Sequence, residues 1–136
     1  MRRRFFVIIL MVVCLLGCYG CGKKYNEFYG QSEVAVTIMT DAVELLEKCQ
    51  DGELTAEATV YQLEVLINRY SYIKDEEDQA EETTVLAGRI AVLNVEIACG
   101  GIDIALSRCD RGTGTVLEVE EAVQSGLDSL RDSLYD

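Results

Sequence analysis

The chain contains no histidine, no proline and no tryptophan among its 136 residues. Without histidine, the commonest general base and metal ligand is missing, so Ser-His-Asp and Cys-His nucleophile systems are excluded. Without proline, the chain lacks the residue that most strongly breaks helices. We predict no catalytic residue, no cofactor and no metal site, and a chain of this length is typical of a single domain.

Basic residues are also scarce. Twelve Lys and Arg stand against 24 Asp and Glu, which gives a formal net charge of −12 at pH 7. A surface this acidic repels nucleic acid, because the phosphate backbone carries charge of the same sign. The charge balance therefore excludes a nucleic-acid partner.

The N-terminal segment has a composition of its own. Residues 2–4 are all arginine, Phe5 to Leu16 is an unbroken apolar run, and Gly17 follows it. A basic start, a short apolar stretch and a small residue are typical of a secretory signal. The alternative is a retained transmembrane helix, which needs roughly 20 apolar residues. The apolar run is shorter than that, so a cleaved signal is the preferred interpretation.

The residues Leu15, Leu16, Gly17 and Cys18 resemble the lipobox of bacterial lipoproteins, with Leu16 larger than the usual Ala or Ser. The resemblance implies that diacylglycerol is attached to the Cys18 sulfur and that cleavage makes this cysteine the mature N-terminus. It predicts a signal peptide at residues 1–17 and an extracytoplasmic protein, anchored by lipid to a membrane of the cell envelope. Nine Lys and Arg would then face 24 Asp and Glu, a formal net charge of −15.

The rest of the chain carries the periodicity of amphipathic helices. Four helices are expected, with starts near Ser32 (or Asn26), Thr55, Ala80 and Thr115. Thr115 and Glu118 have the spacing of a capping box, and Asp51-Gly52 is a typical helix stop. Short connections favour antiparallel neighbours. We therefore predict an all-α, up-down antiparallel bundle of three to four helices at residues 31–136, behind a lipidated tether at residues 18–30.

The third expected helix is apolar on most of its circumference. One stripe consists of Leu86, Ile90, Leu93, Ile97 and Ile104, and further apolar residues lie around the other side. Such a helix is usually buried by neighbours on several sides. The pattern therefore predicts that it is the central helix of the bundle.

The register of these helices places the cysteines. A hairpin at residues 50–54 would bring Cys49 level with about Thr55, and a second fold near Glu77 would bring Thr55 level with Cys99. Cys49 and Cys99 would then be in register on neighbouring helices. An exported chain lies where disulfides persist, so a Cys49–Cys99 crosslink is favoured. Cys49–Cys109 is the alternative if Gly100-Gly101 bends the third helix. The other alternative is that all three are buried free thiols, since cysteine is among the most buried residue types.

Aromatic residues gather at the end of the expected bundle that would face the membrane. They are Tyr25, Phe28, Tyr29, Tyr70 and Tyr72, together with Tyr135 if the fourth helix returns to that end. One interpretation is a plug that closes the end of the bundle. The other is a partner surface, because tyrosines supply rigid amphipathic contact area.

The leading functional hypothesis is a protein-interaction or structural module, tethered to the membrane by lipid on Cys18, with a protein partner near the membrane surface. The alternative is a domain that binds a small ligand or calcium, through the aromatic end or the acidic stretch that begins at Asp75. Enzymatic activity is not expected, because no pair of carboxylates has a spacing that indicates a catalytic cleft.

Overall fold

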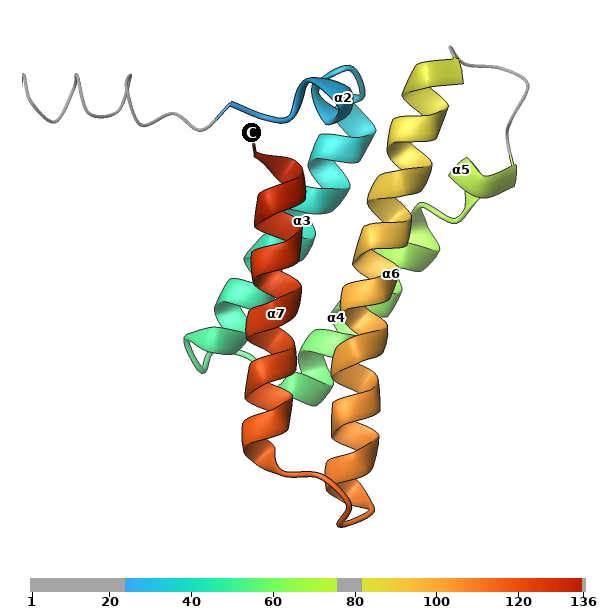
Figure 1. Cartoon of the computed structure of the whole chain (residues 1–136). Helices are drawn as coiled ribbons and strands as arrows, with labels where there is room; N and C mark the ends of the chain where they lie inside the picture. Colours follow the sequence, from blue (N-terminus) through green and yellow to red (C-terminus); the bar gives the residue numbers. More distant parts are fainter. Residues whose placement is uncertain (1–23, 76–81, 136) are drawn as a thin grey trace, which may run out of the picture.

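The computed structural model describes residues 24–75 and 82–135, which form helices and no strand within those ranges (Figure 1). The helices are α2 (Glu27–Gly30), α3 (Glu33–Gln50), α4 (Ala56–Arg69), α5 (Tyr72–Asp75), α6 (Glu82–Asp110) and α7 (Val116–Leu134). The predicted all-α bundle is confirmed. The signal segment and Cys18 lie outside the described residues.

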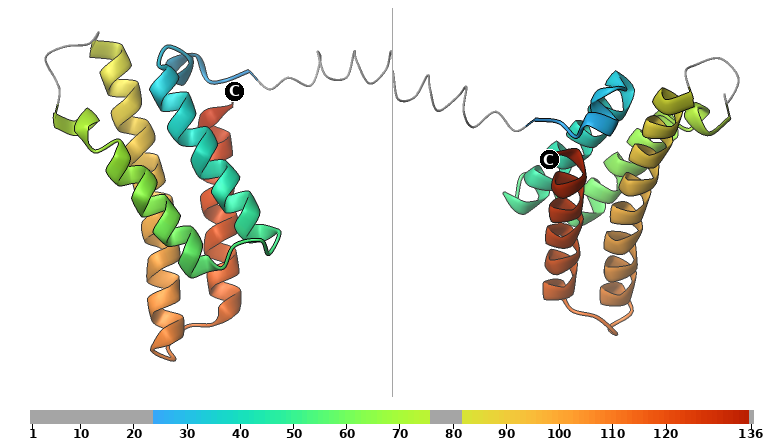
Figure 2. Two further views of the ribbon diagram at one scale, coloured as in Figure 1. Left: turned by 180° about the vertical axis from the view of Figure 1, so that it is seen from behind. Right: turned by 45° about the horizontal axis from the view of Figure 1, so that its top comes forward.

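The four long helices α3, α4, α6 and α7 alternate in direction, as expected for an up-down bundle (Figures 1 and 2). α6 packs against α3, α4 and α7, and α3 also packs against α4 and α7. The α6–α7 hairpin extends beyond the α3–α4 hairpin at the end far from the C-terminus. At the other end lie α2, the start of α6 and the last turn of α7, so both described chain ends meet there.

Local sequence signals set the helix boundaries. The side chains of Ser32, Thr55 and Thr115 each accept a hydrogen bond from a backbone N–H of the first turn that follows. Thr115 and Glu118 form the full capping box, which leaves fewer unsatisfied donors at the start of α7. Gly52 follows α3 with a φ of 79°, a left-handed conformation that glycine adopts without steric cost. These predicted starts and this stop are confirmed.

The folded domain begins earlier than predicted. The Asn26 N–H donates to the Leu134 carbonyl at 2.8 Å, and Tyr25 pairs with Tyr135 as an antiparallel bridge. Residues 25–30 therefore belong to the bundle, and the predicted tether at 18–30 is too long. Cys18 lies seven positions before Tyr25. Such a segment spans at most about 25 Å, so lipid on Cys18 would hold the bundle close to the membrane.

The core brings α7 close to its neighbours. A Cβ added to Gly126 would lie 3.2 Å from the Ala98 Cβ of α6, which shows how closely the two helices approach. Leu127, Leu130 and Leu134 of α7 are fully buried. At the rim, Arg131 Nη2 lies 2.6 Å from Glu47 Oε1 and joins α7 to α3.

Candidate interaction surface

The side of α6 that faces the core is made mostly of small residues. Its fully or nearly fully buried residues include Ala87, Ala91, Val95, Ala98, Ile102 and Ala105. Small side chains let the axis of α6 lie close to the helices around it. α6 packs against α3, α4 and α7, as predicted for the central helix. The expectation that its whole circumference is covered is wrong, because these neighbours leave one face of the helix open.

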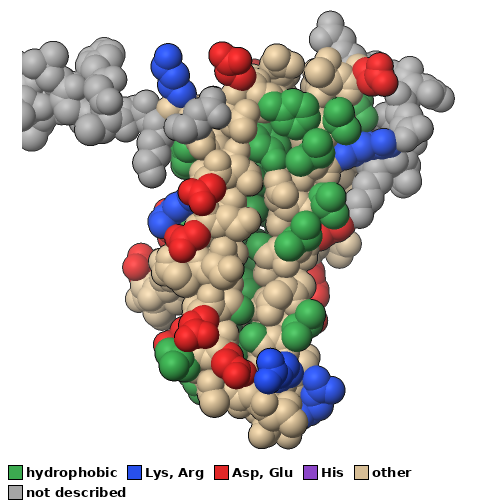
Figure 3. Space-filling model, in the orientation of Figure 1, with side chains coloured by type: hydrophobic (Ala, Val, Ile, Leu, Met, Phe, Trp, Pro, Cys, Tyr) green, Lys and Arg blue, Asp and Glu red, His purple; other side chains and the backbone are tan. Residues whose placement is uncertain are grey.

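The larger apolar residues of α6 lie on the open side. Leu86, Leu93, Ile97 and Ile104 are between 47% and 64% exposed, and Ile90 between them is half-buried. We call these five residues the α6 stripe. Figure 3 shows hydrophobic side chains along this face of the molecule, over α6. Single exposed apolar residues are ordinary, but several large ones along one face of a helix are typical of an interaction site.

The two apolar faces of α6 explain another of its properties. By length and composition alone, α6 is long and apolar enough to cross a membrane, with a mean hydropathy of 1.7 over its most apolar 18 residues. Within that window, 44% is buried inside the bundle. The high hydropathy thus combines a face that packs in the core with a face that is exposed.

Charges of both signs lie beside the α6 stripe. Asp103 and Arg108 are exposed, and the Arg108 guanidinium lies 3.8 Å from the Glu118 carboxylate. The Arg89 Nε donates to the Ile73 carbonyl at 3.2 Å, which connects α6 to α5. The stripe is therefore a narrow apolar seam with charged borders, and its borders are not predominantly basic.

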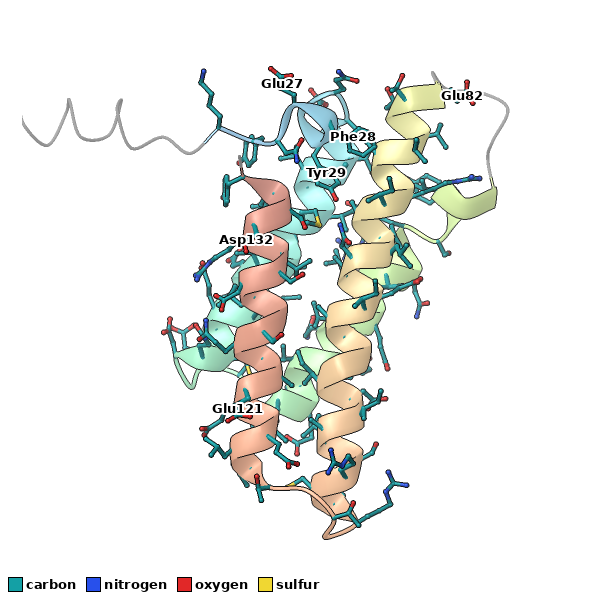
Figure 4. The ribbon with its side chains drawn as sticks, in the orientation of Figure 1. Glu27, Phe28, Tyr29, Glu82, Glu121 and Asp132 are labelled. Carbon is teal, nitrogen blue, oxygen red and sulfur yellow. The ribbon has the colours of Figure 1, made fainter. Side chains whose placement is uncertain are left out.

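The predicted aromatic surface is interrupted by a core residue. Tyr29 is buried, and its hydroxyl accepts a hydrogen bond from Asn94 Nδ2 of α6 at 2.6 Å. Burial raises the pKa of Tyr29, and the hydrogen bond from Asn94 partly offsets this effect. Phe28 meets Tyr29 edge-on, and both turn from α2 toward the bundle whereas Glu27 points away (Figure 4). Tyr29 closes the end of the bundle and is not part of a surface.

The other aromatic residues pack in pairs. Tyr25 stacks on Tyr135 with ring centroids 5.6 Å apart, and Tyr70 lies 6.3 Å from Tyr72. Tyr25 and Tyr72 are exposed, whereas Tyr70 is only partly so. These separate pairs offer less continuous apolar surface than the α6 stripe.

The predicted Cys49–Cys99 crosslink is not formed, since Cys49, Cys99 and Cys109 are free. Cys99 Sγ lies 3.8 Å from the carbonyl of Val60, whereas the predicted register placed it opposite Thr55. Five residues along a helix correspond to about 7.5 Å, more than a disulfide tolerates. The alternative pairing with Cys109 required a bend, but α6 is one helix from Glu82 to Asp110.

We expect the three thiols to differ in reactivity. Burial raises the pKa of Cys99 to about 11, with smaller contributions from Glu64 and Asp103. Thiolate is the nucleophilic form, so Cys99 at pH 8 is protonated as well as shielded. Iodoacetamide at pH 8 should modify Cys49 and Cys109 first and Cys99 only after unfolding, as peptide mass spectrometry would show. Equal rates for the folded protein, or reductant-dependent labelling of Cys49 and Cys99, would contradict this arrangement.

A groove lies at the end where the α6–α7 hairpin extends beyond α3 and α4. Its volume is about 820 Å³, and Cys49 and Cys109 both line it. Leu106, Val119 and Val123 provide apolar lining, and carboxylates such as Asp51 and Glu57 lie among the lining residues. The sequence pattern does not predict this groove, because it arises from the unequal lengths of the two hairpins.

Among the described residues, no three His, Cys, Asp or Glu side chains are grouped so that they could hold a metal ion. Most of the acidic stretch for which calcium was considered, residues 76–81, lies outside the described ranges, as does the candidate lipidation site Cys18. Comparison with protein-family models, with curated proteins and with solved structures finds no match to this chain.

Proposed function

We propose that this protein is a membrane-anchored extracytoplasmic lipoprotein whose acidic helical bundle is a protein-interaction module. The lipobox-like residues Leu15 to Cys18 support the anchor. The observation that carries the interaction role is the α6 stripe, where four large aliphatic side chains remain about half exposed or more. A partner that covers the stripe would remove this apolar surface from water, which favours association.

A partner near the membrane fits the position of the stripe. The first described residues and the start of α6 lie at the same end of the bundle, so the stripe begins near the anchored end (Figure 1). The short connection from Cys18 to Tyr25 would keep this end near the membrane surface. The partner is then a membrane protein or another lipoprotein.

We expect a substitution in the α6 stripe to remove the partner. Ile97→Glu places a charge in the seam, whereas Tyr61→Glu changes an equally exposed residue (64% in both) on α4. Wild-type protein purified from detergent-solubilised membranes should retain a partner protein. A second copy of this chain, detected by a different tag, counts as a partner. Ile97→Glu should lose most of it and Tyr61→Glu should keep it. No enrichment over an unrelated lipoprotein, or equal retention by both variants, would contradict the proposal.

The groove favours a second candidate function, the binding of a small ligand. Its apolar lining and its volume of about 820 Å³ are in the range of ligand pockets. Because Cys49 and Cys109 line the groove, a bound ligand would slow the alkylation of these two thiols and leave Cys99 unchanged. Such selective protection by a candidate metabolite is the result that would favour this function.

A further inference from the structure

The spacing of the α6 stripe is that of a two-stranded coiled coil. Steps of four and three lead from Leu86 to Ile90, Leu93 and Ile97, and Ile104 follows seven residues after Ile97. In heptad terms, isoleucine occupies every a position of the stripe, at 90, 97 and 104, and leucine occupies the d positions 86 and 93. This choice of side chains favours parallel dimers over trimers and tetramers.

We propose that the α6 stripe binds the α6 stripe of a second copy of this chain, in a parallel pair related by a two-fold axis. The inference rests on the proposed interaction role and names the partner. A coiled-coil seam is about two side chains wide, as is the stripe between its charged borders. From Leu86 to Ile104 the seam would extend over about 27 Å of helix.

Charges beside the stripe suit a parallel pair of identical helices. A residue at g lies near the e residue five positions further along the partner helix. This relation brings exposed Asp103 of one copy toward exposed Arg108 of the other, and the two-fold axis repeats the contact. Within its own chain the Arg108 guanidinium donates to the Thr113 carbonyl at 3.3 Å and lies 3.8 Å from Glu118. The side chain is about half exposed (49%), so its outer part is open to a carboxylate of a second copy.

The anchored end gives an independent reason for parallel pairing. α6 starts at the end where the described chain begins, so a parallel pair places both N-terminal segments at one end. Both copies could then be anchored in the same membrane. Confinement to one surface raises the effective concentration of each copy, and a seam of modest area becomes sufficient.

A lipid surface is a poorer occupant of the stripe. Helices that lie on membranes carry basic residues along the borders of their apolar face. Here Asp103 and Glu96 lie on the same border as Arg89, and the whole chain has a formal net charge of −12. Repulsion from anionic headgroups would oppose binding along this face.

A substitution at Gly100 tests the pairing by strengthening the dimer. It occupies the d position between Ile97 and Ile104, and a Cβ added there meets nothing within 4 Å. Gly100→Leu completes the seam, so the dimer of the full-length protein in detergent should bind about tenfold more tightly or better. Gly101→Leu is the matched control, because its site is equally open but lies beside the seam, and it should change little.

Ile97→Glu should weaken the same dimer about a hundredfold or more, since both copies then place a charge in the seam. Tyr61→Glu should leave the dissociation constant unchanged. Sedimentation equilibrium in detergent measures the dissociation constants of the full-length wild type and of the four variants. A wild-type protein that is monomeric throughout, or a gain from Gly101→Leu as large as that from Gly100→Leu, would overturn the pairing.

Photocrosslinking of the full chain in native membranes distinguishes this inference from the wider proposal. A benzophenone amino acid at position 97 should link to the α6 of a second copy near Ile97, whereas the same group at position 61 should not. Links to residues near Leu86 of the second copy would overturn the parallel orientation. A link to a different protein would overturn the pairing of two copies but would still support the proposed interaction role. Links within one chain or to lipid alone would overturn both.

Discussion

Replacement of Cys18 by alanine is expected to abolish the attachment of fatty acid to the protein. The diacylglycerol of a lipoprotein is carried by the cysteine sulfur, so without that atom no lipid is attached. The loss of membrane binding should be large, since each acyl chain contributes about 0.8 kcal/mol for every CH₂ group that it buries. The folded domain should keep its helical content, because Cys18 lies seven residues before Tyr25, where the bundle begins.

Cys21→Ala is the matched control for this prediction. Cys21 is also a cysteine of the N-terminal segment, but its preceding residues Cys18 to Gly20 fit the lipobox poorly. Metabolic labelling with a fatty acid should mark the wild type and Cys21→Ala and leave Cys18→Ala unmarked, and the intact mass should show the same difference. An unlabelled wild type with its signal segment intact would instead support the retained transmembrane helix.

The largest expected loss of stability comes from Leu127→Ala. Leu127 is fully buried in the core between α7 and its neighbours. Removing a leucine side chain from such a site forfeits its transfer free energy and leaves a cavity, which together cost about 2–5 kcal/mol. Gly126 beside it holds α7 close to Ala98, so the backbone has little room to move inward and fill the space. Urea unfolding followed by circular dichroism would measure the change.

Leu117→Ala makes the same chemical change on the same helix. Leu117 is 61% exposed, so the free energy of unfolding should change by only about 0.5 kcal/mol or less. Both variants change helix propensity in the same way, so the difference between their free energies of unfolding reports the effect of burial. Equal losses in the two variants, or a small loss for Leu127→Ala, would contradict the packing of α7 in the core.

The helix starts could be predicted because their causes are local. Ser32, Thr55 and Thr115 cap helices through hydrogen bonds to residues only three positions further along. Gly52 stops α3 because its own backbone adopts a left-handed conformation. α5 was not predicted, because a helix of a single turn is too short to show a repeating pattern of apolar residues.

The orientation of α6 could not be predicted in the same way. Its sequence carries two apolar stripes, one rich in alanine and one with larger aliphatic residues, and each has the period of a helix. Size alone favours burial of the larger set, which would remove more area from water. The bundle instead buries the small residues, since Gly126 and Ala98 allow the close approach of α6 and α7. The stripe that remained outside became the candidate interaction surface.

The amino-acid sequence alone determined the helical class, the helix starts, the acidic charge and the likeness of residues 15–18 to a lipobox, because each depends on neighbours along the chain. Tertiary structure decided which face of α6 is exposed, that Tyr29 lies in the core and that Cys99 meets Val60 rather than Cys49. These outcomes depend on how far α4 is shifted along α6 and on how closely α6 and α7 pack. Both are set by contacts between residues that are distant in sequence.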